Sequence, residues 1–459
     1  MRHQLPVGLD SDGGRIARLR RLLRPGMGIK RWLLVIFVAE LLVASAGALV
    51  LRQIYRDVAP GGPGDSPLLW LLTLQFLPLP LRPVALVAAG AAIFFFGLWR
   101  ILGVLTEPLG RGRAPLVDLV YERRALARGP RIVAIGGGTG LSTLLRGLKT
   151  YSSNLTAIVT VADDGGSSGQ LRTELGLPPM GDIRNCLTAL SDSEATMTGL
   201  LRYRFPGDPA DGGALAGHAV GNLLIAALSD IEGGFEAGVR RMNEVLAVRG
   251  RVVPAAPVAI DLHAELLDGS TVAGQSAISR ARGIRRVWLT PRAARATPDA
   301  LEAIAAADLV VLGPGSLFTS LLPSLLLPQI RDAVRSAAAP CLYVANVATQ
   351  VGETEGYSLA DHMDALVGHI GEGIVDVVLA NDDLTARAPR DWPASPVAPS
   401  LPDAEARNLR LVSAPVVDPE NAHHHDPARL AGAILGLYAS GLHKAEAPLE
   451  APADSLISA

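Results

Sequence analysis

The sequence predicts an α/β sandwich built on a largely parallel sheet and preceded by a two-helix transmembrane hairpin. Two observations predict the sheet: short β-branched runs alternate with longer helical patterns from residue 131 onward, and several of these runs end in glycine-rich turns. The third observation is a pair of long apolar segments before residue 106, which predicts the hairpin. The chain of 459 residues is long enough for one large domain with accessory segments.

The composition excludes some classes of partner and site. The chain has 42 Lys and Arg against 44 Asp and Glu, and this near-balance gives no reason to expect nucleic acid as a partner. Cys186 and Cys341 are far apart and lack metal-ligand spacing, which argues against a disulfide framework. The charge is uneven, because residues 2–31 are rich in Arg and hold only two acidic residues. We therefore expect residues 1–31 to form a basic cytoplasmic N-terminus.

The two apolar segments predict the hairpin over residues 32–105. Leu33 to Leu51 is interrupted only by Glu40 and comes close to the roughly 20 residues that cross a bilayer. A second run extends from Val84 to Leu105. Basic flanks on both sides place both ends in the cytoplasm, so we expect a two-span protein of the cell membrane with a linker over 106–130. A cleaved signal peptide and a third span are the alternatives.

Two turns have the composition of phosphate-binding loops. One follows the expected strand Ile132–Ile135 and precedes a helix from about Leu141; the other follows Leu309–Leu312. Glycine lets a backbone approach a ligand closely, and a helix N-terminus offers free N–H groups to a phosphate. A strand-to-helix connection without a ligand is the alternative in both places. The candidate residues are Gly136, Gly137, Gly138, Thr139 and Gly140 in the first turn and Gly313, Gly315 and Ser316 in the second.

A third expected strand, residues 156–164, ends in two adjacent carboxylates. Strand carboxyl ends line the ligand crevice of a parallel α/β fold, so we expect Asp163 and Asp164 beside the first glycine turn. A carboxylate there could accept ribose hydroxyls, hold Mg²⁺ or act as a general base. Ser167 and Ser168 could bind phosphate oxygens. The alternative is a solvated turn in which each Asp caps its own backbone.

Other polar residues near strand ends and helix starts complete the expected site. Neutral amides and hydroxyls suit recognition of a base or a sugar, whereas loop capping and interior hydrogen bonds, the latter favoured for His218, are the alternatives. The further binding candidates are Asp182, Asn185, His218, Asn222, Asn346, Thr349 and Gln350. We do not expect a metal at His423, His424 and His425, because consecutive side chains point in different directions.

Several long motifs occur in one order: GGGTGLSTLLRGLK, TAIVTVADDGGSSGQLR, GDIRNCLTALSD, GHAVGNLL, ADLVVLGPGSLFTSLLP and ANVATQVGETEGYSLADH. Together they resemble the gluconeogenesis factor family, YvcK, within the larger group that contains 2-phospho-L-lactate transferase, CofD. The resemblance covers residues 131–435, and we expect a domain over 131–440 with a flexible tail over 441–459. It implies a Rossmann-like fold, a homodimer, and binding of a nucleotide diphosphate compound such as UDP-N-acetylglucosamine. It also implies a link to cell shape and wall synthesis.

Two functions follow from these expectations. The first is a membrane-tethered nucleotide-sugar sensor that needs no turnover. The second is a transferase of phosphorus-containing groups, which would use a guanylyl-activated donor with Mg²⁺ on Asp163 or Asp164. An NAD-dependent oxidoreductase is disfavoured, because Leu141 stands where a GxGxxG motif would have its last glycine.

Overall fold

A computed structural model describes residues 123–192, 195–207, 215–386 and 394–442, together with scattered positions between 37 and 95. The chain forms two compact units, residues 1–124 and residues 125–459. The second unit carries nearly all of the described residues.

The expected membrane localisation is wrong for the part of the chain that the structure describes. None of the helices found there is long and apolar enough to cross a bilayer. Most of the expected hairpin, residues 32–105, lies outside the described residues. The two-span assignment therefore has no support in the structure.

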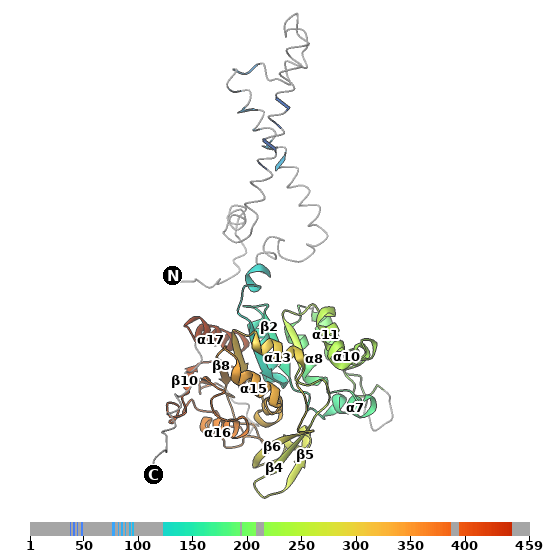
Figure 1. Ribbon diagram of the computed structural model, residues 1–459, viewed down its shortest axis with the longest axis vertical. Helices are drawn as coiled ribbons and strands as arrows, with labels where there is room; N and C mark the ends of the chain where they lie inside the picture. The colour runs from blue at the N-terminus through green and yellow to red at the C-terminus, as the bar shows by residue number, and fades with distance from the viewer. Residues whose placement is uncertain are drawn as a thin grey trace, which may run out of the picture. The chain divides into compact units, whose positions relative to one another are not determined.

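A seven-stranded sheet forms the centre of the second unit (Figure 1), and its strand pairings are parallel. This confirms the α/β prediction with a parallel sheet. In spatial order the strands are β10 (Arg410–Ala414), β9 (Val377–Asn381), β8 (Cys341–Val344), β7 (Leu309–Leu312), β1 (Ile132–Gly136), β2 (Leu155–Val159) and β3 (Arg251–Pro254). All residues of the five central strands β9, β8, β7, β1 and β2 are buried, as in sheets that are covered on both faces.

Helices cover both faces of this sheet. On one face, α6 lies between α17 and α8, and α10 and α11 pack outside α8 and β3. On the other face, α15 contacts α13 and α14, and α14 also contacts α16. The bounds are α6 Gly138–Leu148, α7 Gly166–Leu175, α8 Gly181–Leu190, α9 Ala195–Arg202, α10 Val220–Ile231, α11 Phe235–Val245, α13 Pro298–Ala305, α14 Leu322–Leu325, α15 Pro328–Ser336, α16 Leu359–Ile370 and α17 Pro427–Ala439.

The direction in which the chain adds strands reverses beside β1. From β1 the chain builds outward through β2 to β3, and it then returns to place β7 on the other side of β1 and continues through β8, β9 and β10. The loops after β1 and β7 therefore leave the sheet in opposite directions. In open parallel sheets, ligands bind at the carboxyl ends of the two strands that flank such a switch point.

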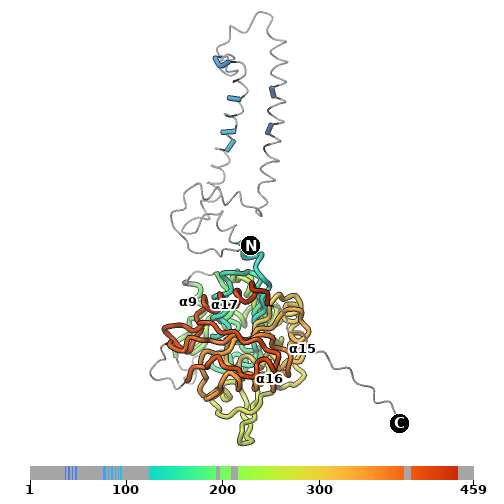
Figure 2. The backbone as a smooth tube through the Cα atoms, turned by 90° about the vertical axis from the view of Figure 1, so that its left-hand side faces the viewer, coloured from blue at the N-terminus to red at the C-terminus, as the bar shows by residue number. Residues whose placement is uncertain are grey.

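Two smaller elements extend the domain beyond its sheet. A three-stranded antiparallel sub-sheet projects from one end of the body (Figures 1 and 2), and the short helix α12 (Gln275–Ile278) contacts two of its strands. A hairpin and a short π-helix, η3 (Leu317–Leu321), lie closer to the switch point. The strands are β4 (Asp261–Leu266), β5 (Thr271–Ala273) and β6 (Ile284–Thr290) in the sub-sheet, and β11 (Val417–Asp418) and β12 (Asn421–His425) in the hairpin.

Two boundaries differ from the sequence-based expectation. Helix α6 begins at Gly138, ahead of Leu141, so the glycine turn supplies the first turn of the helix. Strand β2 ends at Val159, before the carboxylates, because the backbone beyond it bonds irregularly to the segment after β3: the Ile260 N–H donates to the Val161 carbonyl.

Candidate functional site

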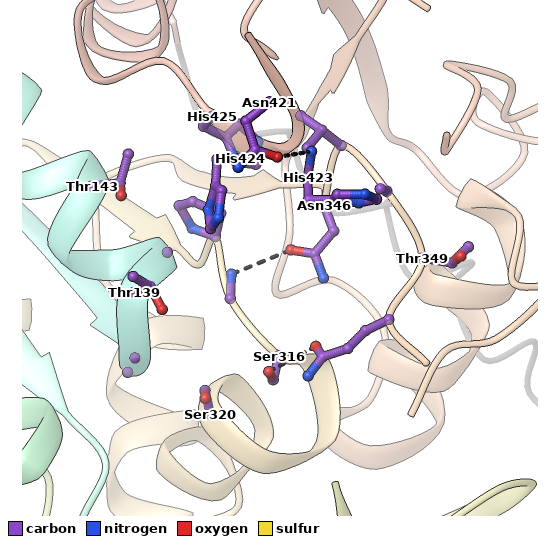
Figure 3. Close-up of a pocket in the computed structure, with 18 residues that line it drawn as sticks. Thr139, Thr143, Ser316, Ser320, Asn346, Thr349, Asn421, His423, His424 and His425 are labelled. Atoms are coloured by element: carbon purple, nitrogen blue, oxygen red, sulfur yellow. Dashed lines mark hydrogen bonds between the residues drawn. The ribbon is translucent and has the colours of Figure 1, made fainter. Parts of the chain in front are cut away.

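A pocket of about 430 Å³ lies at the switch point. The loops after β1, β7 and β8 form it together with β12 (Figure 3). Figure 3 shows Thr139 and Thr143 on one side, Thr349 on the opposite side, and Ser316 below the histidines of β12. We call this cavity the switch-point pocket; among the described residues, no Lys, Arg, Asp or Glu belongs to its lining.

The two glycine turns form one wall because their backbones nearly touch. A Cβ on Gly140 would lie 2.5 Å from the Pro314 carbonyl oxygen, so any side chain there would push the turns apart. Gly137 is the N-cap residue of α6 and places no side-chain cap on its first-turn N–H groups. The wall therefore presents the N-terminus of an 11-residue helix to the pocket.

The loop after β8 is tied to the turn after β7. The Asn346 Oδ1 accepts a hydrogen bond from the Gly315 N–H at 3.3 Å, and the Ser316 hydroxyl donates to the Gln350 Oε1 at 2.8 Å. The Thr349 hydroxyl accepts from the Ser395 N–H at 2.9 Å, which fixes the outer side of this loop. The structure thus brings both glycine turns and the expected polar residues of the β8 loop into one pocket.

Three histidines of β12 complete the lining, and the sequence analysis did not assign them to the ligand site. The buried His425 Nε2 lies 3.2 Å from the Ala345 carbonyl oxygen, and burial lowers the His425 pKa to about 4, so its ring is neutral at pH 7. His424 is exposed in the pocket. The sequence held one clue to their place: the three histidines directly precede Asp426 and Pro427, the start of α17. This helix packs against α6, whose N-terminus lines the pocket. Within the described part of the chain, no group of three or more His, Cys, Asp or Glu could hold a metal ion.

The two adjacent carboxylates of the β2 loop have separate environments, and neither lines the switch-point pocket. The Asp164 Oδ1 accepts from the Ser276 N–H of α12 at 2.8 Å, which ties the loop to the sub-sheet. The Asp163 Oδ1 accepts from the Gly165 N–H at 2.9 Å. Burial raises the Asp163 pKa above its ordinary value, and the nearby Asp164 charge adds to the rise.

Asp182 links Asp163 to the first glycine turn. A Cβ on Gly137 would lie 2.5 Å from the Asp182 Oδ2, so this carboxyl group lies directly against the turn. Burial raises the Asp182 pKa to about 6, and the charge of Asp163 contributes to the rise. We call Asp163 and Asp182 the acidic cluster. It contacts Gly137, which itself lines the pocket.

The remaining expected residues form a buried polar network beside the acidic cluster. The Ser167 hydroxyl lies 3.2 Å from the His218 Nδ1 and accepts from the Asn222 amide at 3.1 Å. Arg184 donates to Asn222 and to Asn185, both at 3.2 Å. The Ser168 hydroxyl accepts from the Gly181 N–H at the start of α8. The expected site residues therefore fall into two groups, one around the pocket and one around the acidic cluster.

The comparisons with known proteins agree with the motifs. A model of the family 2-phospho-L-lactate transferase CofD matches residues 132–417. The gluconeogenesis factor of Bacillus subtilis (strain 168) is 45% identical over 314 residues, which are 67% of this chain and 98% of that protein. A relative from Nostoc sp. (strain PCC 7120 / SAG 25.82 / UTEX 2576) is 42% identical over 447 residues, 94% of each chain.

A solved structure of a related protein supports the same fold. The crystal structure of a member of the UPF0052 family from Bacillus halodurans is 44% identical, with a TM-score of 0.62, and the match covers 67% of this chain and 99% of that one. The high identity over nearly the whole length of such relatives settles the family. The chain belongs to the 2-phospho-L-lactate transferase CofD family and, within it, to the gluconeogenesis factors.

Proposed function

We propose that this protein binds a nucleoside diphosphate sugar in the switch-point pocket, and that UDP-N-acetylglucosamine is the first compound to test. The observation that carries the proposal is the convergence of three turns, after β1, β7 and β8, on one pocket of about 430 Å³. That volume is within the range of about 300–1,000 Å³ typical of small-molecule sites.

The lining suits a diphosphate on one wall. The first-turn N–H groups of α6 carry the partial positive charge of a helix N-terminus, and the Thr139 hydroxyl can donate to a phosphate oxygen. The Ser316 hydroxyl can do so by giving up its bond to Gln350. The described residues that line the pocket include no carboxylate, although Asp182 lies directly behind Gly137 on this wall. The Asn346 and Gln350 amides are neutral groups that can recognise a base or a sugar.

Mg²⁺ is part of the proposal, and the acidic cluster is where it would bind. Asp164 fits poorly as a ligand, because both of its oxygens face the sub-sheet: Oδ1 accepts from the Ser276 N–H, and a Cβ on Gly274 would lie 2.0 Å from Oδ2. Asp182 lies against Gly137 and Asp163 lies close enough to raise the Asp182 pKa, so the two fit the usual pattern in which one or two carboxylates share Mg²⁺ with substrate phosphates. The ion would offset the repulsion between these carboxylates and the phosphates.

In this proposal the protein senses the nucleotide sugar without turnover, acts as a homodimer, and links the ligand to cell shape and wall synthesis. The gluconeogenesis factors that it resembles support a role in carbon metabolism by their names. A transferase of phosphorus-containing groups is the second candidate. The raised pKa of Asp182, about 6, favours it, because an acid or base that works near neutral pH needs such a value.

Calorimetric titration of the full chain tests both candidates. The titrants are UDP-N-acetylglucosamine, GDP and NAD, each with and without Mg²⁺. Selective binding of the UDP sugar without product formation supports the sensor, whereas a preference for GDP supports the transferase. Absence of binding by all three compounds would contradict the proposed function.

A further inference from the structure

A buried glutamate outside the pocket holds the turn after β7 from below. Glu353 is 2% exposed and does not line the switch-point pocket. Its Oε2 accepts from the Phe318 N–H at 3.2 Å, and its Oε1 accepts from the Thr319 hydroxyl. Both donors belong to η3, which begins directly after Ser316. Because the first N–H groups of a helix have no partner within it, the glutamate satisfies a donor that the turn leaves open.

The loop that carries Glu353 contacts this turn at successive points. Asn346 and Gln350 bond to Gly315 and Ser316 on the pocket side, and Glu353 bonds to Phe318 and Thr319 on the buried side. Two parts of one loop therefore hydrogen-bond to this turn from opposite sides.

The loop itself has a fixed shape. The Thr354 N–H donates to the Gln350 carbonyl oxygen at 2.9 Å, and the Gln350 N–H donates to the Thr354 hydroxyl at 2.9 Å. A Cβ on Gly352 would lie 2.6 Å from the Ser279 carbonyl oxygen, so the loop also lies close against the segment that leads into β6. A loop closed in this way can impose its shape on the turn that it contacts.

We propose that Glu353 is a positioning residue, which keeps residues 313–316 in the shape that binds the diphosphate without touching the ligand. The inference rests on the proposed function and deepens it. Burying a carboxylate lowers the stability of the fold unless hydrogen-bond donors compensate it. The two bonds that Glu353 accepts from η3 supply that compensation and tie the glutamate to this turn. If the turn keeps its binding shape for only a tenth of the time, the apparent dissociation constant rises about tenfold.

The surroundings of Glu353 set the expected pH dependence. Burial raises its pKa to about 7, and the bonds from Thr319 and Phe318 oppose the rise. Tyr357 and His369 pack edge-on against Phe318, while Glu355 on the same loop pairs with Arg282 at the surface. As the pH falls through 7, Glu353 takes up a proton and its grip on η3 weakens. The test therefore compares variants at matched pH rather than relying on one pH profile.

Glu353→Gln in the full chain is the test variant, and Glu355→Gln, two residues away and exposed, is its matched control. Titration with UDP-N-acetylglucosamine at pH 8 is expected to show about tenfold weaker binding for Glu353→Gln and an unchanged constant for Glu355→Gln. The difference in dissociation constant between Glu353→Gln and the unaltered protein is expected to become smaller toward pH 6, where Glu353 is protonated. Equal affinities at pH 8 would overturn the inference. If Glu353→Gln unfolds at a much lower temperature than the unaltered protein, Glu353→Asp, which keeps the charge, takes its place in the titration.

Hydrogen exchange in the ligand-free protein separates this inference from the proposed function. Backbone amides of residues 317–321 are expected to exchange faster in Glu353→Gln than in Glu355→Gln, because the Phe318 N–H then bonds to a weaker acceptor. Unchanged exchange would overturn the positioning role even if no nucleotide binds. Faster exchange with no binding of UDP-N-acetylglucosamine by the unaltered protein would overturn the proposed function alone.

Discussion

The switch-point pocket and the acidic cluster are neighbours that share Gly137, yet they differ in almost every physical respect. The pocket is open and lined by backbone, hydroxyls, amides and imidazoles, whereas the acidic cluster holds two carboxylates in surroundings that raise both pKa values. An anion is favoured at the first and disfavoured at the second unless a cation joins it. The comparison shows that one loop cluster can hold an anion site and a candidate cation site a few residues apart.

The largest expected effect comes from Gly140→Ala. The new Cβ would lie 2.5 Å from the Pro314 carbonyl oxygen and separate the two turns, at a cost of ~1–3 kcal/mol in the free energy of unfolding. We expect binding of UDP-N-acetylglucosamine to be lost. Gly432→Ala in α17, where nothing lies within 4 Å of the added Cβ, is the control and should be neutral or mildly stabilising. Tight binding by Gly140→Ala would show that the pocket does not hold the ligand.

Asp182→Asn should stabilise the protein at pH 7. The folded-state pKa, about 6, exceeds the ordinary value of 3.8, so the folded state binds the proton more tightly and loses stability as the pH rises between these values. Removing the charge should therefore raise the free energy of unfolding at pH 7 by roughly 1–3 kcal/mol, with the gain gone below pH 4. Denaturant unfolding at pH 7 and at pH 3.5 measures this gain, with Asp230→Asn, at an exposed position near the end of α10, as the control. A gain that persists at pH 3.5 would contradict the electrostatic origin.

His425, on the pocket side, should affect the pH dependence of stability with the sign opposite to that of Asp182, and His425→Gln tests this. The folded-state pKa of about 4 lies below the ordinary 6.5, so the unfolded chain binds the extra proton and stability falls as the pH drops from 6.5 toward 4. Because glutamine does not titrate, the unfolding free energy of the variant should change less between pH 6.5 and pH 4 than that of the unaltered protein, by roughly 1–2 kcal/mol. Parallel curves for the variant and the unaltered protein would mean that His425 is not buried in its neutral form.

The smallest expected effect is that of Ser316→Ala. The variant loses the hydroxyl that donates to Gln350 and that can turn to a phosphate when the ligand binds, which corresponds to about 1 kcal/mol or roughly fivefold in affinity. Calorimetric titration measures it, and Ser336→Ala, at an exposed position on α15 outside the pocket lining, is the control. A Ser316→Ala protein with unaltered affinity would place the phosphates away from this turn.

Local pattern was enough to predict the strands and turns that build the pocket. The segments Ile132–Gly140 and Leu309–Ser316 could be placed because apolar runs, glycines and helix starts are adjacent in the sequence. The parallel-sheet prediction then placed both turns at one edge of the sheet, and the structure agrees.

The rest of the site depended on contacts between distant segments. No local pattern shows that Ser276 takes the Asp164 carboxylate, that β12 brings His424 to the pocket, or that Glu353 reaches under η3. The membrane assignment rested on the apolarity of residues 33–51 and 84–105, most of which lie outside the described residues. Within the described residues no helix is long and apolar enough to span a membrane.

The most direct test of the account is a crystal structure of the full chain with UDP-N-acetylglucosamine and Mg²⁺. We expect the diphosphate in the switch-point pocket, within about 3 Å of the first-turn N–H groups of α6 and of the Ser316 hydroxyl, the usual hydrogen-bond distance. A diphosphate bound on the network of Ser167 and Arg184, with the switch-point pocket empty, would contradict it.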